Sequence, residues 1–109
     1  MINADVEKAL RKIALQKNDI AVLDAVITGR RAQVSSISED QQRVRENMKA
    51  LKGSSEEKAL VERYVRELNE QEDRVQALRR EITEMQQKRD AAQSALNGMI
   101  EALQMDVTL

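Results

Sequence analysis

Apolar residues recur every seven positions through both halves of the chain, and this repeat constrains the fold more than any other feature. Two series three residues apart run through the first half, and two more run through the second. Only three of 14 positions in the first half and two of 13 in the second are polar. The average spacing of 3.5 residues predicts two long helices paired as a left-handed coiled coil. The first series of each half (a positions) is Val6, Ile13, Ile20, Ile27, Val34, Gln41, Met48 and Val61, Leu68, Val75, Ile82, Arg89, Leu96, Leu103; the second (d positions) is Ala9, Gln16, Leu23, Arg30, Ile37, Val44, Leu51 and Tyr64, Gln71, Leu78, Met85, Ala92, Met99.

The composition supports an all-α fold and removes most catalytic chemistry. The only aromatic residue is Tyr64, and the 109 residues include no proline and three glycines, which is unsuited to a β-sandwich or barrel. The absence of histidine and cysteine excludes imidazole bases, thiolate nucleophiles and nearly every zinc site. We therefore expect a non-enzymatic protein without cofactor or metal.

One turn separates the two repeats. Gly53 can adopt the left-handed conformation that ends a helix, and Ser54 followed by Glu57 is typical of a capping box that begins the next one. Asn3 can cap the first helix. The sequence predicts one hairpin over residues 1–109, with helices at 3–52 and 55–104, a turn at 53–54 and a tail at 105–109.

A three-helix alternative rests on weak helix formers between residues 28 and 38. Ser36 or Ser38 could cap a new helix there. The a series nevertheless passes from Ile27 to Val34 without a change of phase, which favours one continuous helix. Gly29 would then mark a bend or a close approach.

Opposite charges favour an antiparallel pair. Residues 1–52 carry a net charge of +3 and residues 53–109 carry −4. The a and d positions face one another if paired residue numbers add to 105, which places Gln41 opposite Tyr64, or to 112, which places Gln41 opposite Gln71. A tight turn at Gly53 favours 105.

The open end of the predicted hairpin has more apolar surface than two helices can bury. Apolar residues outside the a and d positions widen the apolar arc of the first helix, and the distal second helix carries a matching set. Such a surface predicts self-association, as a dimer that forms a four-helix bundle, or contact with another domain of a parent protein. The residues expected at this interface are Leu10, Leu15, Val22, Val26, Ile100 and Met105.

Other binding sites are weaker candidates. Paired carboxylates such as Glu56-Glu57 fit a solvated face, since no histidine accompanies them. A nucleic-acid-binding arm is the alternative function, because basic doublets such as Arg79-Arg80 could contact phosphates, but acids intersperse them and aromatic platforms are lacking. Membrane binding is not expected, because the apolar end lacks a dense lysine rim and interfacial aromatics. The cysteine-free composition and the missing signal-peptide core weakly favour the cytoplasm.

The residues around the turn resemble a known family. The segment Arg45-Glu46-Asn47-Met48-Lys49-Ala50-Leu51, followed by Gly53-Ser54, Arg63-Tyr64-Val65, Leu68 and Gln71-Glu72, is similar to the helical C-terminal part of large, uncharacterised bacterial proteins described as mucoidy-inhibitor-like. In that family the helical segment accompanies a β-rich portion, which this sequence lacks. The resemblance implies a module from a larger protein whose open end faced the missing domain or another subunit.

Overall fold

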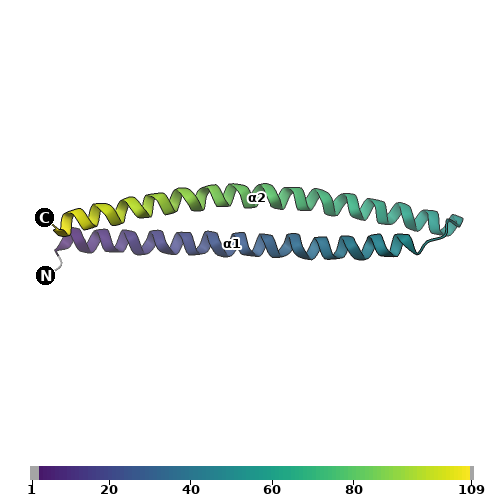
Figure 1. The fold of residues 1–109 in the computed structure, drawn as a ribbon, viewed down its shortest axis with the longest axis horizontal. Coiled ribbons are helices and arrows are strands. Elements are labelled where there is room, and N and C mark those ends of the chain that lie inside the picture. The colour runs from purple at the N-terminus through teal and green to yellow at the C-terminus, as the bar shows by residue number, and fades with distance from the viewer. Residues whose placement is uncertain (1–2, 109) are drawn as a thin grey trace. The chain divides into compact units, whose positions relative to one another are not determined.

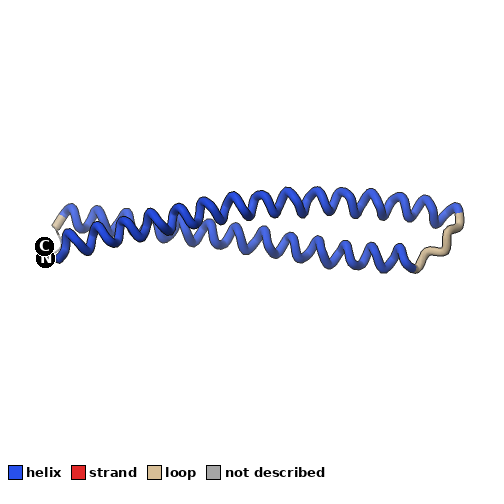
Figure 2. The backbone as a smooth tube through the Cα atoms, turned by 45° about the horizontal axis from the view of Figure 1, so that its top comes forward, coloured by secondary structure: helices blue, strands red, loops and turns tan. Residues whose placement is uncertain are grey.

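The chain forms two long α-helices in the computed structural model, which describes residues 3–108. Helix α1 spans Ala4–Lys49 and helix α2 spans Ser55–Thr108, and the described residues form no strand. The two helices lie side by side in opposite directions and are joined by one loop (Figures 1 and 2). The predicted all-α helical hairpin is confirmed.

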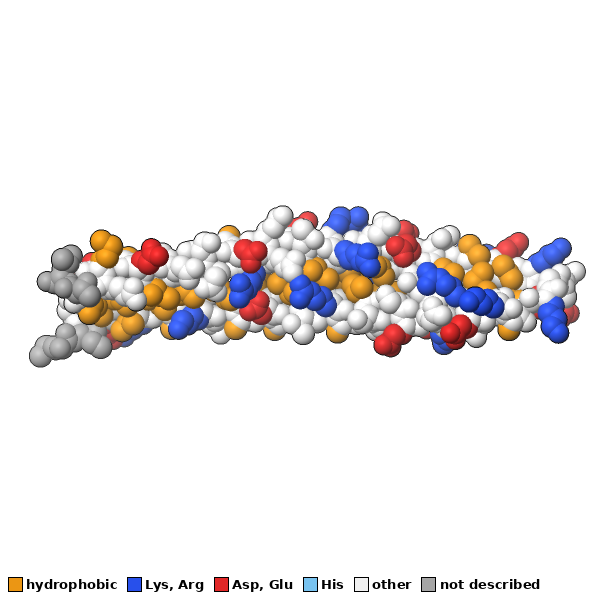
Figure 3. Space-filling view, viewed as in Figure 1, with side chains coloured by type: hydrophobic (Ala, Val, Ile, Leu, Met, Phe, Trp, Pro, Cys, Tyr) orange, Lys and Arg blue, Asp and Glu red, His pale blue; other side chains and the backbone are white. Residues whose placement is uncertain are grey.

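The seven-residue repeat forms the contact between the helices. Every predicted a and d position is buried or partly buried, and no other position is fully buried. Apolar side chains accordingly gather along the line where the helices meet (Figure 3). Burying one such side chain stabilises the fold by roughly 1.5–3 kcal/mol. The most buried positions are Ile13, Ile20, Ile27, Gln41, Val44, Val75, Leu78 and Leu96.

The contacts divide the hairpin into two units. The terminal unit comprises Met1–Thr28 and Thr83–Leu109, and the loop unit comprises Gly29–Ile82. In the terminal unit, Ile13, Ile20 and Leu96 form a buried cluster against which Met99 and Leu103, among others, pack. In the loop unit, Val44 and Leu78 are fully buried. Where the sequence predicted a single domain, the structure has one hairpin with two sets of internal contacts.

The helix ends carry the predicted caps. Asn3 Oδ1 accepts a hydrogen bond from the Val6 amide at 2.8 Å, and Ser54 Oγ accepts one from the Glu57 amide at 3.1 Å. Glu57 completes the capping box, since its carboxylate accepts hydrogen bonds from the amides of Ser54 and Lys52. Gly53 has a φ of 87°, the left-handed conformation that favours glycine.

Helix α1 is continuous through Gly29, so the three-helix alternative is wrong. A β-carbon built at Gly29 meets no atom within 4 Å, which excludes the close approach suggested by the sequence. The second helix begins at Ser55 as predicted, but the C-terminal ends of both helices differ from the prediction. Helix α1 ends at Lys49 rather than at 52. Helix α2 continues to Thr108 through the expected tail, because residues 105–108 include no glycine or proline. Leu109 lies outside the described residues.

The pairing register of 105 is wrong, and the contacts fit 112. Gln71 Nε2 donates a hydrogen bond to Asp40 Oδ2, and Gln41 Nε2 donates one to Glu72 Oε2 at 3.3 Å. The residue numbers of these two pairs add to 111 and 113, one on each side of 112. The tight turn that favoured 105 does not form, because α1 ends early and the chain continues through a non-helical segment, residues 50–54, before α2 begins. At 54 residues against 46, α2 is long enough to extend past the end of α1.

Two glycine substitutions should change stability in opposite directions. Gly53→Ala forces a side chain into the left-handed region, so we expect the free energy of unfolding to fall by about 1–2 kcal/mol. Gly29→Ala occupies open space within a helix and should raise it by about 1 kcal/mol. Thermal unfolding followed by circular dichroism checks both. Equal shifts in one direction would contradict the backbone described here.

Engineered disulfides can test the register, because the chain has no native cysteine. Ile37→Cys combined with Val75→Cys pairs positions that add to 112 and should form an intramolecular disulfide under mild oxidation. Ile37→Cys combined with Leu68→Cys, which adds to 105, is the matched control and should remain reduced. Mass spectrometry of the monomer distinguishes the two. A disulfide in the control alone would restore the register of 105.

Candidate partner-binding surface

Large apolar side chains remain exposed mainly in the terminal unit. Leu15 is 67% exposed and Met105 is 65% exposed, and the same unit carries three further large apolar residues above 40%. Among residues 29–82 of the loop unit, Val65 is the one exposed large apolar residue, at 42%. The exposed apolar residues of the terminal unit are Leu10, Leu15, Val22, Met105 and Val107.

Four of the six residues predicted at the interface are exposed, and two are partly buried. Leu10, Leu15, Val22 and Met105 are exposed. Val26 is partly buried, and Ile100 packs against the buried cluster of the terminal unit. Sequence reasoning missed Val107, which is 64% exposed, although its spacing of seven residues from Ile100 places both on one flank of α2.

The heptad positions place these residues on two opposite flanks of the hairpin. The g flank comprises the g positions, each one residue before an a position, and the neighbouring c positions, each two residues after an a position. The e flank comprises the e positions, each one residue after a d position. In an antiparallel pair like flanks meet, as Gln33 and Arg74 do: both are g positions, and Arg74 Nη2 donates a hydrogen bond to Gln33 Oε1 at 3.4 Å. The apolar surface is therefore not one continuous arc. Leu10, Ile100 and Val107 lie on the e flank, and Leu15, Val22, Val26 and Met105 lie on the g flank.

The g flank of α2 in the terminal unit carries small residues. Ala91, Ala95, Gly98 and Ala102 follow one another at intervals of four, three and four residues, and all four are exposed. A β-carbon at Gly98 would meet no atom within 4 Å. The g flank thus combines the large Leu15 and Val22 on α1 with a row of small residues on α2 that is followed by the large Met105.

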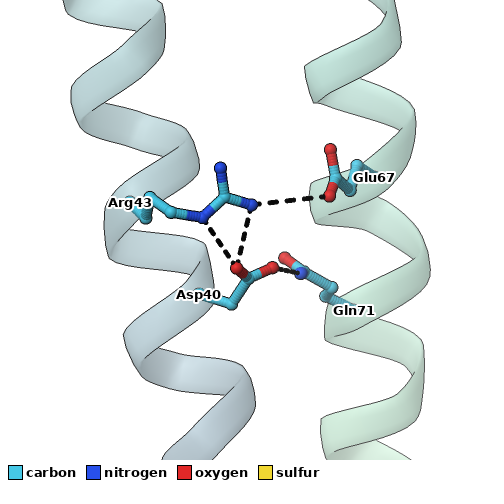
Figure 4. A network of polar contacts seen from close by, with 4 residues as sticks. All are labelled: Asp40, Arg43, Glu67 and Gln71. Carbon is cyan, nitrogen blue, oxygen red and sulfur yellow. Dashed lines mark hydrogen bonds and ion pairs between the residues drawn. The ribbon is translucent and has the colours of Figure 1, made fainter.

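In the loop unit the g flank is polar. Arg43 Nη2 lies 2.9 Å from Asp40 Oδ1 and 4.0 Å from Glu67 Oε1, while Gln71 on α2 donates to the other Asp40 oxygen (Figure 4). The arginine and glutamine hold the pKa of Asp40 below its ordinary value, and Asp40 in turn raises the pKa of Arg43. This network joins the two helices across their flank.

Two arginines at d and a positions form cross-helix ion pairs. Arg30 Nε lies 2.8 Å from Glu81 Oε2 in the loop unit, and Arg89 Nε lies 3.0 Å from Asp24 Oδ1 in the terminal unit. Each of the two arginine side chains is 33% exposed. Because carboxylates already neutralise them, they are poorly placed to bind phosphates.

The described residues offer little for other chemistry. Among residues 3–108 no group of three or more Asp or Glu side chains is arranged to hold a metal ion. Neither described helix has an apolar stretch long enough to cross a bilayer. The surface hollows lined by Arg63, Arg66, Glu67 and Glu70, and by Ser36, Glu39, Asp40 and Arg43, are open and charged. No family model, curated protein or solved structure matches this chain.

The polar ties of the loop unit should make the hairpin sensitive to acid. The folded structure lowers the pKa of Asp40 from 3.8 and that of Glu57 from 4.5, so the unfolded chain binds protons more readily in this range. Their stabilisation is present above about pH 5 and is lost as the pH falls below 4. Melting temperatures measured between pH 6 and 2 should show this decline, and Asp40→Asn should flatten part of it.

Arg43→Gln provides the matching control for Asp40→Asn. In the wild type it should reduce acid sensitivity, since Asp40 loses its principal partner. In the Asp40→Asn background it should have little further effect, because the two residues act through one contact. An Asp40→Asn variant with the pH profile of the wild type would contradict this account.

Proposed function

We propose that the chain is a structural protein–protein interaction module that self-associates through its terminal unit. Two hairpins would pack into a four-helix bundle, and the module would act by holding surfaces together at a fixed spacing, without turnover. The resemblance to mucoidy-inhibitor-like proteins suggests that it serves this role within a larger bacterial protein.

One observation carries the proposal: the exposed large apolar residues are concentrated in the terminal unit. The a and d positions are already covered by contacts within the chain, so they are not available to a partner. The terminal unit nevertheless exposes Leu10, Leu15, Val22, Met105 and Val107, whereas residues 29–82 of the loop unit expose only Val65 among their large apolar residues. Three of these residues, Leu15, Val22 and Met105, share the g flank, and exposed apolar surface gathered on one face is typical of interaction sites. The contrast supports a partner at the terminal unit and solvent at the loop unit.

Sedimentation equilibrium over a wide range of concentrations tests self-association. We expect a reversible dimer in the wild type. Leu15→Gln combined with Val22→Gln should weaken it at least tenfold, about 1.4 kcal/mol, because two large apolar side chains leave the interface. Val65→Gln is the matched control, an exposed apolar residue in the loop unit, and should leave dimerisation unchanged.

A monomer at high protein concentration would overturn the proposal. Binding to nucleic acid that weakens steeply with increasing salt would instead favour the nucleic-acid-binding arm.

A further inference from the structure

We propose that the g flank of the terminal unit is a self-complementary docking surface for a second copy, in which α1 of each copy covers α2 of the other. The symmetry axis of this dimer runs parallel to the helices. The inference rests on the proposed self-association and adds the face, the helix pairing and the register.

The first argument is the division of large and small residues between the two helices. On the g flank, α1 presents Leu15 and Val22, which are 67% and 54% exposed. On the same flank α2 presents the row from Ala91 to Ala102, whose small side chains leave room for the large side chains of another helix. Large side chains of one helix packing into holes of another is how helices associate. Pairing α1 with α2 of the second copy packs the large side chains of each α1 against the small side chains of the other copy's α2.

The second argument is the level of the residues along the helices. In the terminal unit, Gln16 Nε2 donates to the Ala92 carbonyl oxygen at 2.9 Å, and Arg89 pairs with Asp24 at 3.0 Å. The residue numbers of these two pairs add to 108 and 113. Applied to Leu15, the same sums place it level with residues 93–98 of α2. Rotation about an axis parallel to the helices preserves these levels. Leu15 of the second copy therefore meets the small residues around Ala95 and Gly98.

Charge distinguishes this arrangement from the other symmetric one, in which α1 packs on α1. Residues 4–17 of α1 carry four basic and two acidic side chains, a net charge of +2, whereas residues 95–108 of α2 carry only Glu101 and Asp106, a net charge of −2. Packing α1 on α1 would bring like charges together and set large residues against large ones. Packing α1 on α2 brings opposite charges together, which stabilises the pair modestly and selects the orientation.

Disulfide formation between tagged chains tests the helix pairing. Leu15→Cys and Ala95→Cys are prepared separately with tags of different mass, mixed as folded proteins and oxidised gently. We expect the mixed disulfide to exceed either homodimeric disulfide several-fold. A dominant disulfide between two Leu15→Cys chains would overturn the proposal in favour of α1 on α1. If neither the mixed disulfide nor a homodimeric disulfide forms in a protein that sedimentation shows to be dimeric, the choice of face is overturned.

A second measurement separates docking from folding. Gly98→Leu fills the proposed hole with a large side chain but improves helix propensity, so we expect dimerisation to weaken at least tenfold while the helical content is kept. Gly29→Leu is the matched control, since Gly29 is also helical with open space around it but belongs to the loop unit. It should leave dimerisation unchanged. If Gly98→Leu dimerises as the wild type does, the hole is not part of the interface. A wild-type monomer would instead overturn the proposed function itself.

Discussion

The meeting of two apolar seams within one chain is the contact on which the rest of the structure depends. An isolated helix of this composition would leave its a and d residues in water, and helical stability in proteins comes mainly from packing such a face. The fold-back covers every one of these positions. The fold-back also engages the a and d residues in contacts within the chain, so any partner can reach only the flanks. The function of such a hairpin therefore depends on residues outside the a and d positions, and these are the residues in which the two units differ most.

Register shows how polar groups constrain an apolar seam. A seam of mixed Ile, Leu and Val tolerates a shift by one heptad, but Gln41 is 94% buried and its amide needs a partner. An unpartnered buried polar group costs about 1–3 kcal/mol, whereas changing the length of a loop costs a few tenths. Pairing Asp40 with Gln71 and Gln41 with Glu72 therefore decides the alignment. The loop adapts by continuing outside the helices over residues 50–54.

Local signals in the sequence predicted local structure well. The heptad repeat, the Asn3 cap, the Ser54–Glu57 capping box and the left-handed Gly53 depend on neighbouring residues, and all are present. Features that depend on the alignment of two distant segments were not predictable in the same way. The end of α1, the register and the pairing of Arg89 with Asp24 required knowing which residues lie level with one another. The apolar excess of the terminal unit was visible, but its division between two flanks followed only from the alignment.

The two units place different kinds of interaction on the same flank. In the loop unit the g flank carries Asp40, Arg43 and Glu67, whose contacts weaken with salt and acid. In the terminal unit it carries Leu15, Val22 and small residues, whose association depends on excluding water and is strengthened by salts that are themselves excluded from protein surfaces. The polar ties hold the helices of one chain in register, and the apolar surface is the one on which we propose that a second chain docks. Because separate residues carry these two kinds of contact, conditions that weaken the polar contacts of the loop unit need not dissociate the proposed dimer.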